Sequence, residues 1–494
     1  MSFTTVTFIF VFFPISMALY YLVYFLEFKN KFKNLKKFRI LDLTVIAISS
    51  IFYIWAIFDD IFRFYAYIFI VYLFGKIIEI LKQKNKHLVV YEGERNKRIS
   101  LAVPILALGV IFLVYTLVHF KYTGILARLY NFFFKSDIVA KNYIAPLGIS
   151  FITFSAISYL VDIYRGDAKS GSLIDCALYL IFFPKVVSGP IVLWKDFSNQ
   201  IDERKINIDL MTRGITKIMI GFSKKLILAD TFGGLIATAN GSIDIFTSWG
   251  VALLYMLQIY FDFSGYSDIV IGMSNMMGYS FFENFNFPYI SLSITEFWRR
   301  WHISLGRWFR EYIYFPLGGS RKGKKRSIIN ILIVFIITGV WHGAGWTYML
   351  WGMINGICNA VERLVSKKNW YIKTPKFIKW LYAMSVTFFC WELFRFSDMT
   401  SFKNWIKIMF GVTTFDNIPY TWQYYFDRRI IFLAIIGIIT STVFGLPKIQ
   451  NSYKKALEKK SLYIINQIII TAMFVISLLF MVNSNYSPFI YFQY

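Results

Sequence analysis

The chain has 494 residues, of which 57% are hydrophobic, 20% are aromatic and only 16% are charged. Soluble globular chains carry about 25% charged residues, so this composition excludes an ordinary soluble protein. The formal net charge of +25 would suit a nucleic-acid-binding protein. That class is excluded because the lysines and arginines lie in short loops between apolar runs.

Apolar runs long enough to cross a membrane occur along the whole chain. A span takes about 20 apolar residues, and somewhat fewer where the bilayer thins. The clearest runs are residues 3–26, 41–58, 62–81, 101–118, 328–341, 430–446 and 462–481. By this criterion we expect an all-α, polytopic integral membrane protein with about eleven to thirteen transmembrane or re-entrant helices.

Basic loops predict the orientation of these spans. The loop at residues 29–39 is rich in lysine and arginine, which places it in the cytoplasm and the N-terminus outside. Further basic clusters recur at two-span intervals, at residues 82–98, 321–326, 367–368 and 454–460. The last span therefore leaves residues 483–494 on the extracytoplasmic side.

The whole chain, residues 1–494, is expected to form a single integral membrane domain. It contains no long linker rich in Gly, Ser or Pro, and no internal repeat of the kind that marks many transporters. The three cysteines, Cys176, Cys358 and Cys390, share no spacing typical of a metal or redox site. We therefore predict no metal centre.

Polar and helix-breaking residues interrupt the middle of the chain. The apolar stretches at residues 146–151 and 183–190 contain Pro and Gly, which indicates interrupted or re-entrant helices that are buried or lie beside a cavity. Asp262 and Asp268 interrupt another apolar run and need partners, for which His, Arg or a helix N-terminus would serve. Simple charge pairing and a role in chemistry both remain open for these carboxylates.

Residues 295–314 are expected to form one amphipathic helix at the cytoplasmic interface. Aromatic and apolar residues recur on one stripe at spacings of three and four: Trp298, Trp301, Leu305, Trp308 and Tyr312. Arginines gather on the opposite side: Arg299, Arg300, Arg307 and Arg310. His302 falls at the border between the aromatic stripe and the arginine side. The segment is either a membrane-surface helix without chemistry, or a basic face that binds a phosphate-bearing donor close to His302.

His342 lies near the end of an apolar run that follows a basic cluster. From Arg326 to His342 a straight helix carries the imidazole roughly 24 Å from the cytoplasmic edge. An ionisable group at this depth is costly unless it is partnered or lines a wet cavity, so it is a candidate for function. Three glycines leave room for backbone or substrate around it: Gly339, Gly343 and Gly345. Trp341 and Trp346 are expected to wall a cavity.

These segments resemble the membrane-bound O-acyltransferase family, and within it the bacterial branch that acetylates polysaccharides such as alginate and peptidoglycan. The resemblance rests on five motifs: Tyr260–Asp268, Glu283–Phe285, Thr295–Leu305, Tyr314–Gly319 and Gly339–Ala344. It extends over residues 146–364, which implies a catalytic core at about residues 140–365. It also implies helices arranged around a tunnel in the bacterial cytoplasmic membrane.

The resemblance implies roles for individual residues. His342 corresponds to the catalytic histidine of the family and would act as general base on an acceptor hydroxyl that attacks an acyl thioester. His302 occupies the second signature position and would orient the donor or steady the oxyanion. The predicted substrate-binding residues are Trp298, Arg299, Arg300, Trp341 and Asp262.

The C-terminal residues 488–494 also resemble the polysaccharide branch. The resemblance implies that Tyr491 takes the acetyl group from the tunnel and passes it to an extracytoplasmic transferase. The predicted position of this tail outside the membrane agrees with such a relay. The alternative interpretation is an aromatic anchor at the membrane interface.

The predicted function is transfer of acetyl from a cytoplasmic thioester, acetyl-CoA, to hydroxyls of a cell-envelope or exported polysaccharide. No permanently bound cofactor is expected, and the expected partners are membrane lipids and an extracytoplasmic polysaccharide acetyltransferase. One alternative is D-alanyl transfer to teichoic acid, although a chain of that kind should lack the loop at residues 315–319. The other is a polysaccharide or lipid exporter without chemistry of its own.

Overall fold

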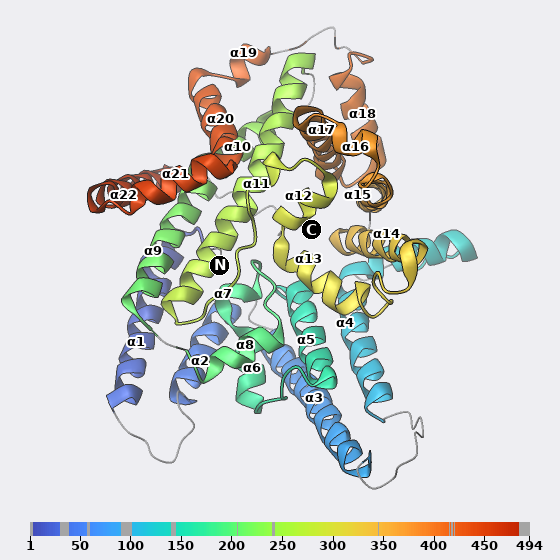
Figure 1. Cartoon of the computed structure of the whole chain (residues 1–494), viewed down its shortest axis with the longest axis vertical. Coiled ribbons are helices and arrows are strands. Elements are labelled where there is room, and N and C mark those ends of the chain that lie inside the picture. The colour runs from blue at the N-terminus through green and yellow to red at the C-terminus, as the bar shows by residue number, and fades with distance from the viewer. Residues whose placement is uncertain are drawn as a thin grey trace. The chain divides into compact units, whose positions relative to one another are not determined.

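A computed structural model describes residues 3–29, 39–56, 60–89, 101–139, 145–204, 206–239, 243–343, 345–413, 415, 418 and 420–483. Within these ranges the regular structure is entirely helical. Figure 1 labels the helices in chain order and colours them from blue at the N-terminus to red at the C-terminus. The all-α class predicted from the sequence is confirmed.

Eight helical segments in the described part of the chain are long and apolar enough to cross a membrane. They are η1 with α1 (Phe8–Phe12 and Phe13–Lys29), α2 (Arg39–Ala56), α3 (Ile61–Val89), α4 (Ala102–Phe134), α14 (Gly323–His342), α17 (Lys376–Arg395), α20 with η6 (Arg428–Ser441 and Val443–Gly445) and α22 (Lys460–Asn483). The protein is therefore a multi-pass membrane protein.

Other long helical segments carry buried polar side chains. They are α5 (Ile149–Arg165), the continuous run of α9 (Ile208–Phe222), η3 (Ser223–Ala229) and α10 (Asp230–Thr238), α11 (Ile245–Met276) and α15 (Trp346–Val365). These polar groups include Asp162, Lys225, Asp262 and Glu362. Charged side chains in such positions need partners, because an unpaired charge in an apolar surrounding is costly.

The chain divides into two compact units. The first comprises Phe3–Met211 together with Ser274–Phe281, and the second comprises Thr212–Met273 together with Phe282–Tyr494. In the first unit α3, α4 and α5 pack on one another, and α2 packs on α1 and on α6 (Leu173–Ile181). In the second unit α15 packs along α14 and also contacts α17, while α22 packs on η3.

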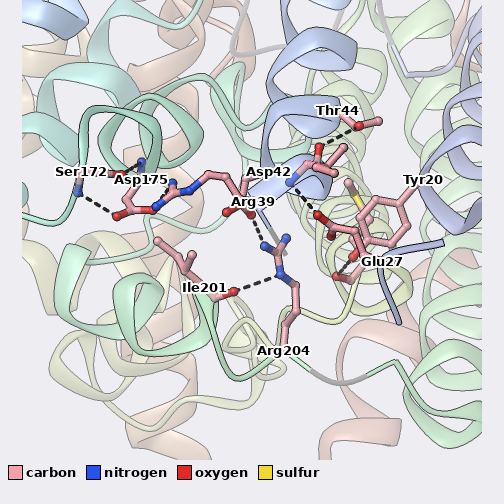
Figure 2. A network of polar contacts seen from close by, with 11 residues as sticks. Tyr20, Glu27, Arg39, Asp42, Thr44, Ser172, Asp175, Ile201 and Arg204 are labelled. Carbon is pink, nitrogen blue, oxygen red and sulfur yellow. Dashed lines mark hydrogen bonds and ion pairs between the residues drawn. The ribbon is translucent and has the colours of Figure 1, made fainter. Parts of the chain in front are cut away.

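Two arginines connect helices within the first unit, as Figure 2 shows. Arg39, at the start of α2, donates to Ser172 Oγ and Asp175 Oδ1, both at 3.1 Å. Ser172 and Asp175 form the capping box that begins α6. Arg204, which follows α8 (Trp194–Ile201), pairs with Asp42 of α2, and both side chains are completely buried. Each charge of this pair depends on the other for solvation.

The predicted interruption of the apolar stretches near residues 146–151 and 183–190 is confirmed. α6 ends at Ile181, and the short α7 (Phe183–Val186) begins again directly after it. α5 begins after Gly148, which has a positive φ of 69°. A Cβ at Gly148 would lie 1.9 Å from the carbonyl oxygen of Val186. Only glycine fits this close approach of two backbones, because it lacks Cβ and tolerates positive φ.

Candidate active site

The segment that contains His302 is not one helix, so that prediction is wrong. It consists of α12 (Ile294–Arg300), α13 (Ile303–Phe309) and a π-helical turn η5 (Arg310–Tyr314). The break falls at His302, whose φ of 43° and ψ of 54° are left-handed. The loop at residues 284–286 supplies hydrogen bonds in place of those that the helix gives up there. The Asn286 N–H donates to the Arg300 carbonyl, and the Ile303 N–H donates to the Asn284 carbonyl, both at 2.9 Å.

The aromatic stripe of this segment faces protein. Trp301, Leu305, Trp308 and Tyr312 are all buried. On the basic side Arg299 is exposed, whereas Arg300 forms an ion pair with Glu296 at 2.8 Å and donates to the Asn286 carbonyl at 3.1 Å. Arg299 is therefore available to a ligand, while Arg300 already helps to hold α12 in place.

His302 is buried beside the break, with 1% of its surface exposed, and not at the border of a basic face. Its Nδ1 lies 3.2 Å from Asn284 Oδ1, and the edge of Phe263 contacts its ring at a centroid distance of 4.7 Å. Its Nε2 is buried without a hydrogen-bond partner among the described residues. Burial lowers the pKa of His302 to about 3, so the imidazole is neutral at physiological pH.

His342 is the last residue of α14, and only 4% of its surface is exposed. Rings from three elements surround its imidazole. The centroid distances are 4.5 Å to Trp341, 5.1 Å to Trp351 of α15 and 5.0 Å to Phe394 of α17. Trp341 therefore packs against His342, whereas Trp346 is 70% exposed. That the two tryptophans wall a cavity remains a prediction.

The glycines near His342 serve helix packing. A Cβ at Gly339 would lie 2.5 Å from the carbonyl oxygen of Tyr348, and a Cβ at Gly343 would lie 2.4 Å from the ring of Tyr348. The expected uses of these positions were room for backbone or for substrate. Gly339 shows the first of these, whereas the neighbour of Gly343 is a side chain. The glycines let α14 and α15 approach closely, and this approach places Trp351 against His342.

A continuous aromatic cluster connects the surroundings of the two histidines. Trp301 lies 4.7 Å from Trp391 and 6.5 Å from Phe263, and Trp391 lies 6.2 Å from Trp351. Trp298 contacts Trp351 at 5.6 Å and donates its indole N–H to Asn355 Oδ1 at 3.0 Å. The predicted residues His302, Trp298, Trp341 and His342 thus belong to one packed region of the second unit.

Asp262 and Asp268 have lysine partners, a residue type that the sequence analysis did not consider. Asp262 pairs with Lys225 at 2.8 Å, and Asp268 pairs with Lys217 at 2.9 Å and with Lys224 at 2.7 Å. The π-helical turn η3 contains both Lys224 and Lys225. The wider turn re-aims side chains relative to an α-helix, and here consecutive lysines reach two different carboxylates of α11.

Some residues that shape the site were missed in the sequence. Asn284 was quoted only as part of a motif, although it contacts His302 directly. Trp351, Trp391 and Phe394 form much of the aromatic cluster, but they lie in segments that read simply as apolar helices. The recurrence of tryptophan in these apolar segments was the sequence signal that could have indicated an aromatic cluster. Tyr491 lies outside the described residues.

The fold and the site define a polytopic helical membrane protein in which an ionisable group, His342, is buried at the end of a membrane-spanning helix and is a candidate for function. The family model of the membrane-bound O-acyltransferase family matches residues 43–391. The chain belongs to this family, and it is an acyltransferase.

Three relatives illustrate the range of the similarity. The chain is 31% identical to the probable alginate O-acetylase AlgI of Azotobacter vinelandii, over 100% of both chains. It is 34% identical to the peptidoglycan O-acetyltransferase of Helicobacter pylori, over 62% of this chain and 64% of the relative. It is 33% identical to the teichoic acid D-alanyltransferase of Streptococcus thermophilus, over 43% of this chain and 55% of the relative.

Proposed function

We propose that this enzyme transfers acetyl groups from a cytoplasmic thioester, acetyl-CoA, toward hydroxyls of a cell-envelope or exported polysaccharide. The observation that carries the proposal is His342, a buried imidazole at the end of a membrane-spanning helix, enclosed by aromatic rings. The full-length similarity to an alginate O-acetylase supports acetyl as the transferred group and a polysaccharide as its destination.

In the proposed reaction His342 acts as general base. It takes the proton of an acceptor hydroxyl while the oxygen attacks the thioester carbonyl. The new C–O bond forms, the C–S bond breaks, and the thiolate leaves and takes up the proton that His342 has held. His302 contributes from the other side of the aromatic cluster, by orienting the donor or by stabilising the oxyanion.

The remaining binding residues have different environments. Arg299 is exposed and is proposed to bind a phosphate of the donor, with Arg300 nearby in its pair with Glu296. Trp298 and Trp341 would bound the path of the acyl group. Asp262 would meet a substrate as one half of an ion pair with Lys225, not as a lone carboxylate.

The acetyl group is proposed to leave the enzyme through Tyr491 to a separate extracytoplasmic polysaccharide acetyltransferase. The basic-loop pattern supports an outside location for residues 483–494 in the cytoplasmic membrane of a bacterium. Capture of an acetylated enzyme and mapping of the modified residue test this step. Undiminished polymer acetylation by Tyr491→Phe would refute the relay while leaving the acetyltransferase proposal intact.

Two other functions are less well supported. D-alanyl transfer has a relative that matches over less than half of this chain. Such a chain was expected to lack the loop at residues 315–319, which is present here. An exporter without chemistry has no need for a histidine enclosed by packed aromatic rings.

The deciding experiment compares His342→Ala with His119→Ala. His119 lies in α4 within another apolar helix and has no proposed role, so it controls for loss of an imidazole from the membrane region. The measurement is base-labile acetate on the envelope polysaccharide, normalised to inserted protein. We expect His342→Ala to abolish acetylation and His119→Ala to retain it. Retained acetylation in His342→Ala would favour a transport role.

A further inference from the structure

Asn284 holds the segment around His302 with both its backbone and its side chain. It is 1% exposed, and its carbonyl oxygen accepts from the Ile303 N–H at 2.9 Å. Its side-chain Oδ1 lies 3.2 Å from the Ser304 backbone N, 2.9 Å from Ser304 Oγ and 3.2 Å from His302 Nδ1. Its Nδ2 donates to Ser267 Oγ at 3.1 Å.

The backbone of Ser304 decides which end of the amide faces His302. A backbone N–H is always a donor, so the Asn284 atom that it contacts must be the oxygen and not the NH₂ group. An oxygen beside His302 Nδ1 in turn requires that this nitrogen carries the proton. A neutral imidazole has only one N–H, so its Nε2 carries the lone pair.

His302 Nε2 is thus an acceptor at a buried position. It has no hydrogen-bond partner in the described part of the chain, although 99% of the residue is buried. An unsatisfied buried acceptor is costly, because it has lost its hydrogen bond to water without gaining another. The left-handed backbone of His302 adds a further cost for a residue with a Cβ. Such costs persist where a group is held ready for a ligand.

We infer that Asn284 is a positioning residue that fixes His302 in the Nδ1–H tautomer and presents Nε2 as an acceptor to an O–H or N–H group of the substrate. This inference rests on the proposed function and makes the role of His302 more specific. An oxyanion needs a donor, and the Nε2 of this tautomer has no proton to donate. Of the two roles considered above, orientation of a substrate is therefore retained and stabilisation of the oxyanion is not.

The neighbouring charges do not set this tautomer. The carboxylates near Asn284 in the chain or on α11 are Glu283, Asp262 and Asp268. Glu283 and Asp268 pair with Lys217, at 2.6 and 2.9 Å, and Asp262 pairs with Lys225 at 2.8 Å. The ring of His302 packs perpendicular to that of Phe263, which carries no charge. Two polar groups lie near Nδ1: Asn284 Oδ1 at 3.2 Å and the Ser304 hydroxyl at 3.4 Å. The hydroxyl donates to the same Asn284 oxygen at 2.9 Å, so Asn284 is the acceptor that selects the protonated nitrogen.

Substitutions of Asn284 separate positioning from folding. Asn284→Leu removes the acceptor, and we expect turnover to fall by about 100-fold or more, as for loss of a positioned acid–base group. Asn284→Asp keeps an acceptor beside Nδ1 and should retain the tautomer. Its negative charge stabilises the imidazolium and raises the pKa of His302, so the neutral form is lost as the pH falls through the raised value. Asn284→Asp should therefore be active at high pH and gain an acidic limb from His302, in addition to the limb that protonation of His342 gives in both proteins.

The tautomer itself can be measured on the full-length protein with ¹⁵N-labelled histidine. The chain has only four histidines, so His302→Gln identifies the resonances of His302. We expect a protonated Nδ1 and an unprotonated Nε2 in the natural protein and in Asn284→Asp, and a mixture in Asn284→Leu. A rise in KM for acetyl-CoA in Asn284→Leu would place the hydrogen-bonded group on the donor, and a fall in kcat alone would place it on the acceptor.

The inference fails if His302 carries its proton on Nε2, or if Asn284→Leu keeps full turnover and Asn284→Asp keeps the natural pH profile. If Asn284→Leu does not fold, the Asn284→Asp profile and the ¹⁵N spectrum of the natural protein still decide. His342→Ala is measured in parallel. Its inactivity beside unaffected Asn284 variants would refute only this inference, whereas its full activity would refute the proposed function.

Discussion

The contact between α14 and α15 predicts a strong effect of a single methyl group. Gly339→Ala would place a Cβ 2.5 Å from the carbonyl oxygen of Tyr348 and 3.3 Å from the Cα of Gly352. Both are backbone atoms, so no side-chain rotation relieves the clash. An ordinary contact begins at 3.4 Å, and the helices must therefore separate by about 0.9 Å. His342 lies one helical turn beyond Gly339 and moves with it.

A displacement of about 1 Å in a catalytic group reduces turnover by about 100-fold. Overpacking of this kind also costs about 1–3 kcal/mol of stability, which a folded membrane protein can tolerate. The assay is the rate of acetyl transfer per folded molecule in proteoliposomes, with folding checked by monodisperse elution in detergent. Gly234→Ala in the same unit is the matched control, because a Cβ there meets nothing within 4 Å.

Full turnover by a folded Gly339→Ala, equal to that of Gly234→Ala, would refute the reasoning. It would show that the separation of α14 and α15 does not set the position of His342. A loss of activity in both variants would also count against it, because the open position should accept a methyl group.

Two predictions concern stability of the first unit. Arg204→Met leaves the Asp42 carboxylate buried without its partner and should cost about 3–5 kcal/mol of stability. The measurement is the midpoint of thermal unfolding in detergent, which should fall. Arg63→Met is the control: the Arg63 side chain is 71% exposed, so its loss should cost no more than about 1 kcal/mol. Gly148→Ala forces a side chain into a left-handed backbone and against a carbonyl oxygen, and should cost at least about 1–3 kcal/mol in the same assay. Gly124→Ala, with open space around it, should be close to neutral, and equal midpoints for the two glycine variants would contradict the interpretation.

Apolar periodicity and basic loops were sufficient to predict the class of fold. Long runs of hydrophobic residues predict transmembrane helices reliably, because a chain in the hydrocarbon core must satisfy its backbone hydrogen bonds internally and a helix does so. The interruptions near Gly148 and Pro184 were also readable, since glycine and proline have specific backbone consequences. The helix through His302 was predicted wrongly. The spacing of three and four residues between aromatic side chains continues across the break, because α12 and α13 bury the same aromatic side. The break itself depends on hydrogen bonds to residues 284–286, and no local sequence pattern reports those bonds.

The candidate site could be predicted as individual residues but not as an arrangement. His342 stood out because an imidazole within an apolar run is costly, and it is indeed buried at the end of α14. Its aromatic surroundings come from α15 and α17, and contacts between distant segments leave no trace in a single sequence. The lysine partners of Asp262 and Asp268 lie about 40 to 50 residues earlier in the chain, and no local pattern reports that distance. Two of them, Lys224 and Lys225, also lie in a π-helical turn that shifts the register in which they face α11.

The position of His342 at the very end of α14 has an electrostatic consequence. The aligned peptide dipoles of a helix leave a partial negative charge of roughly half an elementary charge at its C-terminal end. A base that takes up a proton becomes positive, and a positive charge near such an end is stabilised by about 0.3–2 kcal/mol. The twenty residues of α14 therefore do more than carry the imidazole into the membrane. In the proposed reaction their backbone favours the charge that would appear on the ring when the acceptor hydroxyl gives up its proton.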